Sequence, residues 1–139
     1  MKPYKIEITM IGLPKSMNGS HGHWRAAAAR RKEWRTKTAW NAIAAGKPKA
    51  PLTKCRIECV RCSSSQMDFD NLVASFKGCI DGLRDAGIIA DDTQQVIVER
   101  KYLWEKASKY SGRIIIRVEA CEDLISAALA ENNIAEARK

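Results

Sequence analysis

Residues 68–92 read DFDNLVASFKGCIDGLRDAGIIADD, and this stretch decides most of what the sequence predicts about the fold. Its middle part, residues 71–86, predicts an amphipathic helix because apolar side chains recur at helical spacing. The members of that apolar stripe are Leu72, Phe76, Cys79, Ile80 and Leu83. Asp70 is expected to cap the start of the helix, and Gly87 is expected to end it. The stretch therefore predicts one helix with aspartates near both of its ends.

The segments before this helix predict two strands and a further helix. Residues 4–11 and 52–61 alternate apolar and polar side chains, which is typical of half-buried strands. Residues 24–45 are rich in alanine, contain no glycine or proline, and predict a helix. Gly46 and Pro48 are expected to stop that helix.

The segments after residue 92 predict two more strands and a final helix. Residues 96–104 and 113–120 are rich in β-branched side chains, and the polar stretch between them predicts an antiparallel hairpin. Residues 123–139 predict a helix. The whole order predicts an α/β (mixed α+β) domain, in which helices cover a small mixed sheet.

The chain has 139 residues, which favours a single domain with a core that needs no disulfide or metal to hold it. We expect residues 1–120 to form that domain and residues 121–139 to form a helical extension packed on it. The start of the chain lacks the apolar stretch of a signal peptide, and no run approaches the length of a membrane span. These features predict a cytosolic location and no membrane partner.

The charge is divided unevenly along the chain. The net charge is +8, and from Lys15 to Arg61 twelve lysines and arginines stand against two glutamates. From Asp68 to Asp92, six aspartates stand against one lysine and one arginine. A nuclease needs both parts, because the basic part attracts the polyanion and the acidic part holds metal ions at the scissile phosphate. A basic protein with a solvated surface is the alternative, and charge alone favours it.

The five cysteines do not predict a disulfide framework, because their number is odd and the chain is expected to stay in the cytosol. Cys59 and Cys62 have the spacing of a zinc-binding pair, but no second pair of this kind exists. Cys55 and Cys59 fall on one face of a predicted strand. We therefore interpret them as core residues.

The aspartates around the predicted helix suggest a metal site. Asp68 and Asp70 occupy alternate positions of an extended segment, so both carboxylates can reach one metal ion. Asp91 or Asp92 would supply a third carboxylate if the chain doubles back after the helix. Carboxylate oxygens suit Mg²⁺, which lowers the pKa of a bound water for phosphodiester hydrolysis. Taken one by one, these aspartates are more simply explained as a helix cap and a turn.

Lys77 is the basic partner of this acidic set. It follows Asp70 by seven residues, about 10 Å along a helix axis, and helical side chains lean toward the N-terminus. A lysine there would orient a phosphate or stabilise negative charge in the transition state. The alternative is an ordinary solvated helix residue.

The candidate DNA-binding residues precede the acidic stretch. The glycine-rich segment of residues 16–25 is a candidate DNA-contacting loop, and the basic face of the helix at residues 24–45 is a candidate phosphate-tracking surface. An ordinary surface loop and a solvated basic face are the alternatives. The residues selected are Asn18, His23, Arg25, Arg30, Arg31 and Lys37.

Over residues 4–119, the sequence resembles the RusA-type Holliday junction resolvases of bacteria and their phages. The residues that carry the resemblance are Asp68-Phe69-Asp70-Asn71-Leu72, Lys77, Ile80-Asp81-Gly82-Leu83, Asp85-Ala86-Gly87 and Asp91-Asp92. The resemblance implies a RusA-like resolvase fold and a homodimer that binds four-way DNA junctions. It also implies paired, symmetric incisions that require Mg²⁺, or Mn²⁺ in its place, in the cytosol of a bacterium or a phage-infected host.

The same resemblance assigns roles to individual residues. It implies that Asp68, Asp70 and Asp92 are the metal-binding carboxylates, with Asp91 adjacent, and that Lys77 is the catalytic lysine. The helix is one turn longer than the family pattern, so counting forward from Asp70 reaches Ala74, whereas counting back from the glycine end reaches Lys77.

A second departure from the family pattern concerns the loop at residues 62–67. This loop is serine-rich where the family often has arginines. A broader nuclease for flaps and forks therefore stays open as an alternative. The other alternative is a non-catalytic junction-binding or DNA-binding module, in which the aspartates merely cap a helix and shape turns.

Overall fold

The computed structural model describes residues 3–15 and 24–121. These residues form a mixed α+β fold whose elements are β1 (Lys5–Ile11), α1 (Trp24–Ala45), β2 (Cys55–Ser63), α2 (Phe69–Ser75), α3 (Lys77–Asp85), β3 (Ile97–Lys106) and β4 (Arg113–Ala120). The helix predicted at residues 24–45 is confirmed, and it ends at Ala45 as expected. The helix predicted for residues 123–139 lies outside the described residues.

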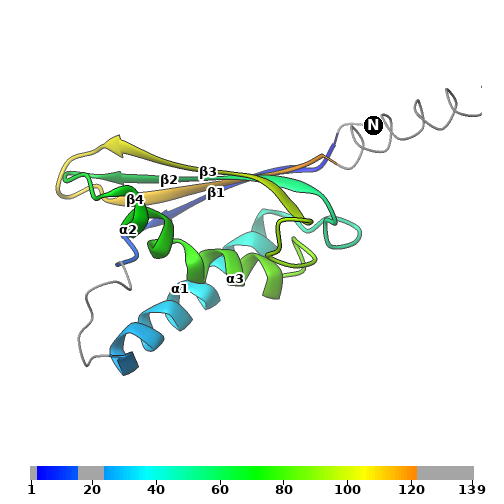
Figure 1. The fold of residues 1–139 in the computed structure, drawn as a ribbon, viewed down its shortest axis with the longest axis horizontal. Coiled ribbons are helices and arrows are strands. Elements are labelled where there is room, and N and C mark those ends of the chain that lie inside the picture. The colour runs from blue at the N-terminus through cyan, green and yellow to red at the C-terminus, as the bar shows by residue number, and fades with distance from the viewer. Residues whose placement is uncertain (1–2, 16–23, 122–139) are drawn as a thin grey trace, which may run out of the picture.

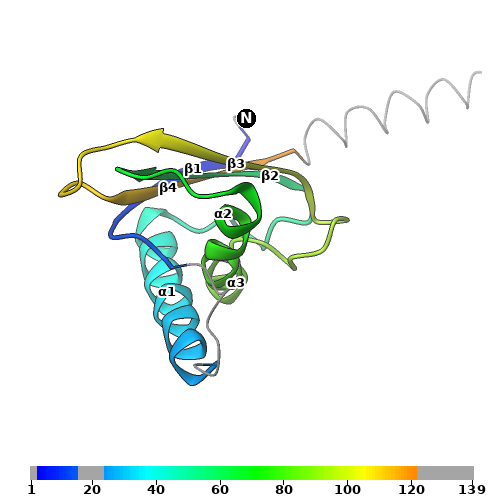
Figure 2. The same ribbon diagram turned by 60° about the vertical axis from the view of Figure 1, so that its left-hand side comes forward.

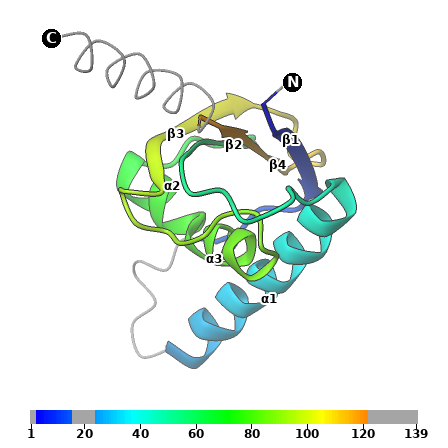
Figure 3. The ribbon, with the colours of Figure 1, turned by 90° about the vertical axis from the view of Figure 1, so that its right-hand side faces the viewer.

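The four strands form one mixed sheet in the order β1-β4-β2-β3. The β2 and β3 strands are parallel, and β4 runs antiparallel to both of its neighbours, β1 and β2. Figures 1 and 2 show the sheet as one layer with the helices gathered under one of its faces. Figure 3 shows α1 and α3 side by side beneath the sheet. The other face has no helix against it among the described residues.

The predicted hairpin between the last two strands is wrong, because β2 lies between β3 and β4. The central position of β2 agrees with its burial, since Cys55, Ile57, Cys59 and Val60 are all buried in the structure. A parallel β2–β3 pair also needs a crossover connection, which α2 and α3 provide. The polar segment after β3 therefore passes across the end of β2.

The helix predicted for residues 71–86 is divided in two at Phe76. The backbone N–H of Phe76 bonds to the carbonyl of Val73 three residues back, and the Ser75 hydroxyl donates to the Leu72 carbonyl at 2.7 Å. A serine that bonds back to its own helix competes with the main-chain ladder and bends it. The apolar stripe nevertheless continues across the break, since Leu72, Phe76, Cys79, Ile80 and Leu83 are all buried.

The two ends of this helical segment differ in how well the sequence predicts them. The helix begins one residue before the expected cap, with Asp68 in the capping position, so the assignment of Asp70 as the cap is wrong. Gly87 ends α3 as expected, with a positive φ of 77°. The N–H groups of Gly87 and Ile88 bond to the carbonyls of Arg84 and Leu83, each at 3.0 Å, which is a Schellman motif.

Two glycines of α3 let it pack closely on α1. A Cβ atom at Gly78 would lie 2.7 Å from the Arg31 carbonyl oxygen, and one at Gly82 would lie 2.9 Å from the Thr38 Cβ. Larger residues would hold the helices apart. The buried Trp34, Thr38 and Ala42 of α1 complete the core against the sheet. None of the three described helices has the length and apolar character that crossing a bilayer requires.

Candidate active site

One cleft of about 170 Å³ gathers residues from α2, α3, the turn after α3, and β3. It is called the acidic cleft below, after the two aspartates among its lining residues. Its lining residues are Val73, Ala74, Lys77, Ile80, Asp81, Asp92, Arg100 and Tyr102. Lys77 and Asp92, which the sequence proposes as catalytic, thus border the same space although they are fifteen positions apart.

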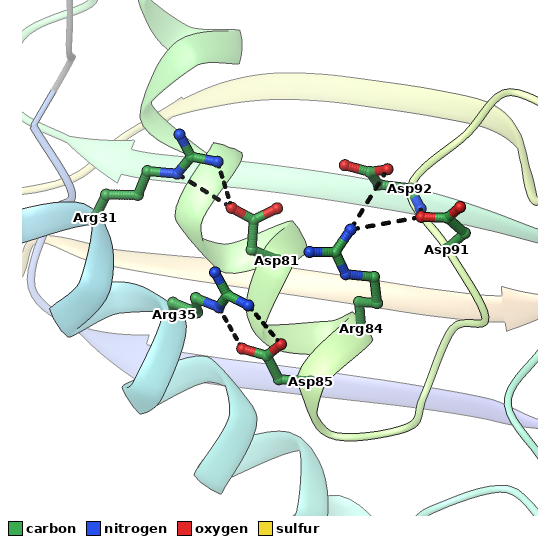
Figure 4. Close-up of polar contacts among 7 residues, drawn as sticks. All are labelled: Arg31, Arg35, Asp81, Arg84, Asp85, Asp91 and Asp92. Carbon is green, nitrogen blue, oxygen red and sulfur yellow. Dashed lines mark hydrogen bonds and ion pairs between the residues drawn. The ribbon is translucent and has the colours of Figure 1, made fainter. Parts of the chain in front are cut away.

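Asp81 is the buried carboxylate of the acidic cleft. Only 3% of the residue is exposed, and its Oδ2 accepts hydrogen bonds from Nε and Nη2 of Arg31 at 3.1 and 2.6 Å. Figure 4 shows Arg31 reaching from α1 to Asp81 on α3. A buried carboxylate is tolerated when it is paired and hydrogen-bonded in this way. Asp81 was not selected from the sequence, although it lies one turn after Lys77 on the same helical face.

Asp91 and Asp92 have different surroundings. The Asp91 carboxylate accepts the backbone N–H of Asp92 at 2.8 Å and lies 3.5 Å from Nη1 of Arg84. The hydrogen bond from the Asp92 backbone, followed by the contact with Arg84, lowers the pKa of Asp91. Asp92 lies 3.9 Å from the same arginine and borders the acidic cleft, as Asp91 does not. Figure 4 shows Arg84 reaching toward both carboxylates. Of the pair, Asp92 is therefore the residue that can contact a ligand in the cleft.

Lys77 begins α3 with its side chain exposed, and it forms no ion pair within residues 3–15 and 24–121. Asp70 precedes the cleft residues Val73 and Ala74 by three and four positions in α2. The Asp70 side chain therefore lies on the same helical face as Val73 and Ala74, one turn closer to the N-terminus of α2. Ala74 borders the cleft but carries no functional group, so Lys77 is the residue that can supply a cation there.

Asp68 precedes α2, and its carboxylate accepts a hydrogen bond from the Asn71 side chain. The carboxylates near the cleft are hard oxygen donors, which is the ligand type that Mg²⁺ takes. Within the part of the chain that the structure describes, however, no three His, Cys, Asp or Glu side chains lie together as a metal-binding group. The donor chemistry suits Mg²⁺, but the aspartates selected from the sequence do not converge on one point.

Arg100 and Tyr102 complete the opposite wall of the acidic cleft, and no sequence motif selects them. The Arg100 guanidinium donates to the backbone carbonyl of Asp92, which ties β3 to the turn that carries this aspartate. Burial raises the pKa of the Tyr102 hydroxyl, so it stays protonated and can donate a hydrogen bond. Because side chains alternate along a strand, the two point to the same face of the sheet.

The basic residues of α1 fall into two groups. Arg31 and Arg35 pair with Asp81 and Asp85, respectively, as Figure 4 shows. Lys37 donates to the Ile11 carbonyl at 2.6 Å and lies over the ring of Trp34. These contacts give Arg31 and Lys37 structural partners in addition to any role in binding DNA.

Arg25, Arg30 and Lys32 belong to the second group, which has no ion pair among the described residues. Arg25 contacts the ring of Trp24, and the Nε of Arg30 is buried without a hydrogen-bond partner. Lys32, Arg31 and Arg35 line a wide hollow of about 700 Å³ on α1. Asn18 and His23, the other two candidate DNA-binding residues, lie outside the described residues.

The face of the sheet that lacks helices is electrically balanced. Four basic and four acidic side chains alternate there in two rows across neighbouring strands, and ion pairs such as Arg117–Glu58 at 2.5 Å join them. The rows are Lys5–Glu119–Arg56–Glu99 and Glu7–Arg117–Glu58–Lys101. In contrast, α1 carries six lysines and arginines against one glutamate. Much of the positive excess of the chain therefore lies on the side of the helices, together with the acidic cleft.

Comparison of the chain with known protein families finds no family model that matches it, and comparison with curated proteins finds no significant match.

Proposed function

We propose that this protein is a metal-dependent, structure-specific endodeoxyribonuclease that resolves four-way DNA junctions and has a RusA-like resolvase fold. The observation that supports the proposal best is that Lys77 and Asp92 border one cleft. Asp70 lies one helical turn before the cleft residues Val73 and Ala74 in α2. The three residues come from α2, α3 and the turn after α3. The proposed reaction, cleavage of four-way junctions, is taken from the resemblance of residues 4–119 to the resolvase family.

In this proposal the cationic residues bind the scissile phosphate. The Lys77 ammonium donates to a non-bridging phosphate oxygen and stabilises the negative charge that develops as water attacks. Arg100, on the facing wall, holds the Asp92 turn in place and offers its remaining N–H groups to the same phosphate. Asp81, fixed by Arg31, keeps a carboxylate on the cleft at a constant position.

We propose Asp70 and Asp92 as the residues that would hold Mg²⁺ or Mn²⁺, although the described residues do not bring them together with Asp68 and Asp91 as one group. When bound, the cation would lower the pKa of a water molecule and make it a nucleophile at neutral pH. In each pair, Asp68 with Asp70 and Asp91 with Asp92, the second aspartate has a backbone that its surroundings hold in place. Asp70 is in the first turn of α2, and the Asp92 backbone is bonded to Asp91 and Arg100.

The charge distribution supports an approach of DNA from the side of the helices. The balanced rows on the other face of the sheet attract neither sign of charge. The wide hollow on α1 presents Arg31, Lys32 and Arg35 against one carboxylate, Asp85, which is paired with Arg35. The Arg31–Asp81 pair joins this hollow to the acidic cleft, because Arg31 lines the first and Asp81 lines the second. A DNA backbone that follows α1 would thus lead to the cleft.

A homodimer is part of the proposal, because paired incisions in a symmetric junction need two copies of the cleft. Trp40 and Ile43 are exposed to 70% and 45%, three residues apart on α1, and are our candidates for the contact between copies. Sedimentation equilibrium of the full chain gives its mass in solution directly. We further propose that the protein works in the cytosol of a bacterium or of a phage-infected host.

The test is incubation of the protein with a mobile four-way DNA junction, with and without Mg²⁺, beside a linear duplex of the same sequence. We expect paired nicks in the junction that require Mg²⁺, spare the duplex and are lost in the Asp70→Asn variant. Tight junction binding without cleavage in Mg²⁺ or Mn²⁺ would instead indicate a DNA-binding module. Equal cleavage of flaps and forks would indicate a broader nuclease.

A further inference from the structure

Phe69 is an exposed aromatic residue between Asp68 and Asp70. It begins α2, and 62% of the residue is accessible to solvent. The core does not need it, because the fully buried Phe76 fills the space between α2 and the sheet. An exposed phenyl ring beside candidate catalytic carboxylates gains free energy when a partner covers it.

The ring of Phe69 is held at the rim of the acidic cleft by Tyr102. The two ring centroids are 6.3 Å apart with an interplanar angle of 85°, and Tyr102 packs in turn on Phe76 at 6.1 Å. Tyr102 itself lines the cleft. Because the contact is T-shaped and most of Phe69 is exposed, much of the Phe69 surface stays free for a stacking partner.

The surroundings of Phe69 indicate the chemistry of that partner. Lys77 and Arg100 border the cleft beside Tyr102 and favour a phosphate, whereas the Phe69 ring favours the flat face of a base. A nucleotide with an unpaired base offers both groups together. The bases of an intact duplex are already stacked on each other, so only a branch or a single-stranded segment can provide one.

We infer that Phe69 stacks on an unpaired base next to the phosphate that the acidic cleft binds, and that it thereby selects branched DNA over linear duplex. The inference rests on the proposed function, which places DNA in the cleft. It assigns selectivity to a residue that belongs to neither the carboxylate set nor the basic face of α1.

Photo-crosslinking tests this inference directly. A four-way junction with 5-iododeoxyuridine at the branch point is bound to the full chain in EDTA, so that cleavage cannot proceed, and is irradiated. Iodouracil crosslinks efficiently to an aromatic ring stacked on it. We expect the crosslink at Phe69, found by mass spectrometry in the tryptic peptide of residues 62–77. We expect it to be lost in Phe69→Leu and kept in Phe69→Tyr.

Binding supplies a second readout with a matched control. Stacking on one base accounts for about tenfold in affinity, so Phe69→Leu should bind the junction about tenfold more weakly, and Phe69→Tyr should restore the affinity. Tyr110→Leu removes an aromatic ring that is 90% exposed in the turn before β4, and it should change neither readout. Because Phe69 and Tyr110 are both exposed, the Phe69→Leu, Phe69→Tyr and Tyr110→Leu variants should unfold at nearly the same temperature as the wild type.

Two further outcomes separate the inference from the proposed function. A crosslink at another residue, or unchanged affinity in Phe69→Leu, overturns the inference even if the junction is cleaved in Mg²⁺. A crosslink at Phe69 that Phe69→Leu abolishes supports the inference even if no variant cleaves DNA, and the nuclease proposal then fails alone.

Discussion

Replacing Gly82 by alanine tests the close packing of α3 on α1, which positions Asp81. An added Cβ would lie 2.9 Å from the Thr38 Cβ and 3.2 Å from the Ala39 backbone nitrogen, and the Arg35 carbonyl oxygen would be closer than either. Ordinary contacts begin at 3.4 Å. Because two of the three opposing atoms belong to the backbone, no side-chain rotation relieves the clash, and the helices must move apart.

The size of the effect follows from two opposing contributions. Overpacking of a well-packed interface costs about 1–3 kcal/mol, and the rigid backbone places this site near the upper end. Alanine gains about 1 kcal/mol over glycine in a helix interior, which offsets part of the cost. We expect a net loss of about 2 kcal/mol in the free energy of unfolding, and a fall of about 6–10 °C in Tm.

The assay is thermal and urea unfolding followed by circular dichroism. Ala29→Gly, at an exposed position inside α1, gives the helix-propensity contribution alone and should cost about 1 kcal/mol. If Gly82→Ala were as stable as the wild type or more stable, the close approach of the two helices would be refuted. The account of how Asp81 is held at the cleft would then fail with it.

Three further predictions concern charged residues of α1 and α3. Lys77→Met should slow single-turnover junction cleavage about 100-fold without changing Tm, since the side chain is exposed; an unchanged rate would remove Lys77 from the mechanism. Arg31→Met should lower the free energy of unfolding by about 2 kcal/mol in urea, because it leaves the buried Asp81 carboxylate unpaired, whereas Arg25→Met should have almost no effect. The hydrogen bond from Arg35 lowers the pKa of Asp85, so this pair stabilises the fold above the unfolded pKa of aspartate, about 4, and the stabilisation is lost as the pH falls through the lowered pKa. Between pH 6 and pH 2.5 the wild type should therefore lose more stability than Arg35→Gln, and parallel stability curves for the two proteins would contradict this.

The sequence predicts the local elements well, because their signals are local. The alternation of residues 5–11, the alanine-rich helix ended by Gly46 and the Schellman glycine at position 87 all appear where the pattern places them. The pairing of strands has no such signal. Nothing in residues 97–120 shows that β2 separates β3 from β4, since that arrangement is a property of the whole sheet.

The candidate site is predicted in part for the same reason. Helical spacing brings Lys77 to the cleft, and the Gly87 turn returns Asp92 to it. Arg100 and Tyr102 depend on the parallel β2–β3 pairing, which a single sequence does not reveal. From the sequence alone, Asp81 is interpreted as a surface residue. In the structure, Gly78 and Gly82 bring α1 close enough for Arg31 to cover it.

The central claim is that the acidic cleft is where DNA is hydrolysed, and a comparison of two neighbouring aspartates tests it most directly. Single-turnover cleavage of a four-way junction in Mg²⁺ would be measured for the wild type, Asp92→Asn and Asp91→Asn. We predict that Asp92→Asn loses at least about 100-fold in rate, because Asp92 borders the cleft, whereas Asp91→Asn stays within about tenfold of the wild type. Wild-type cleavage by Asp92→Asn, with intact folding, would contradict the account.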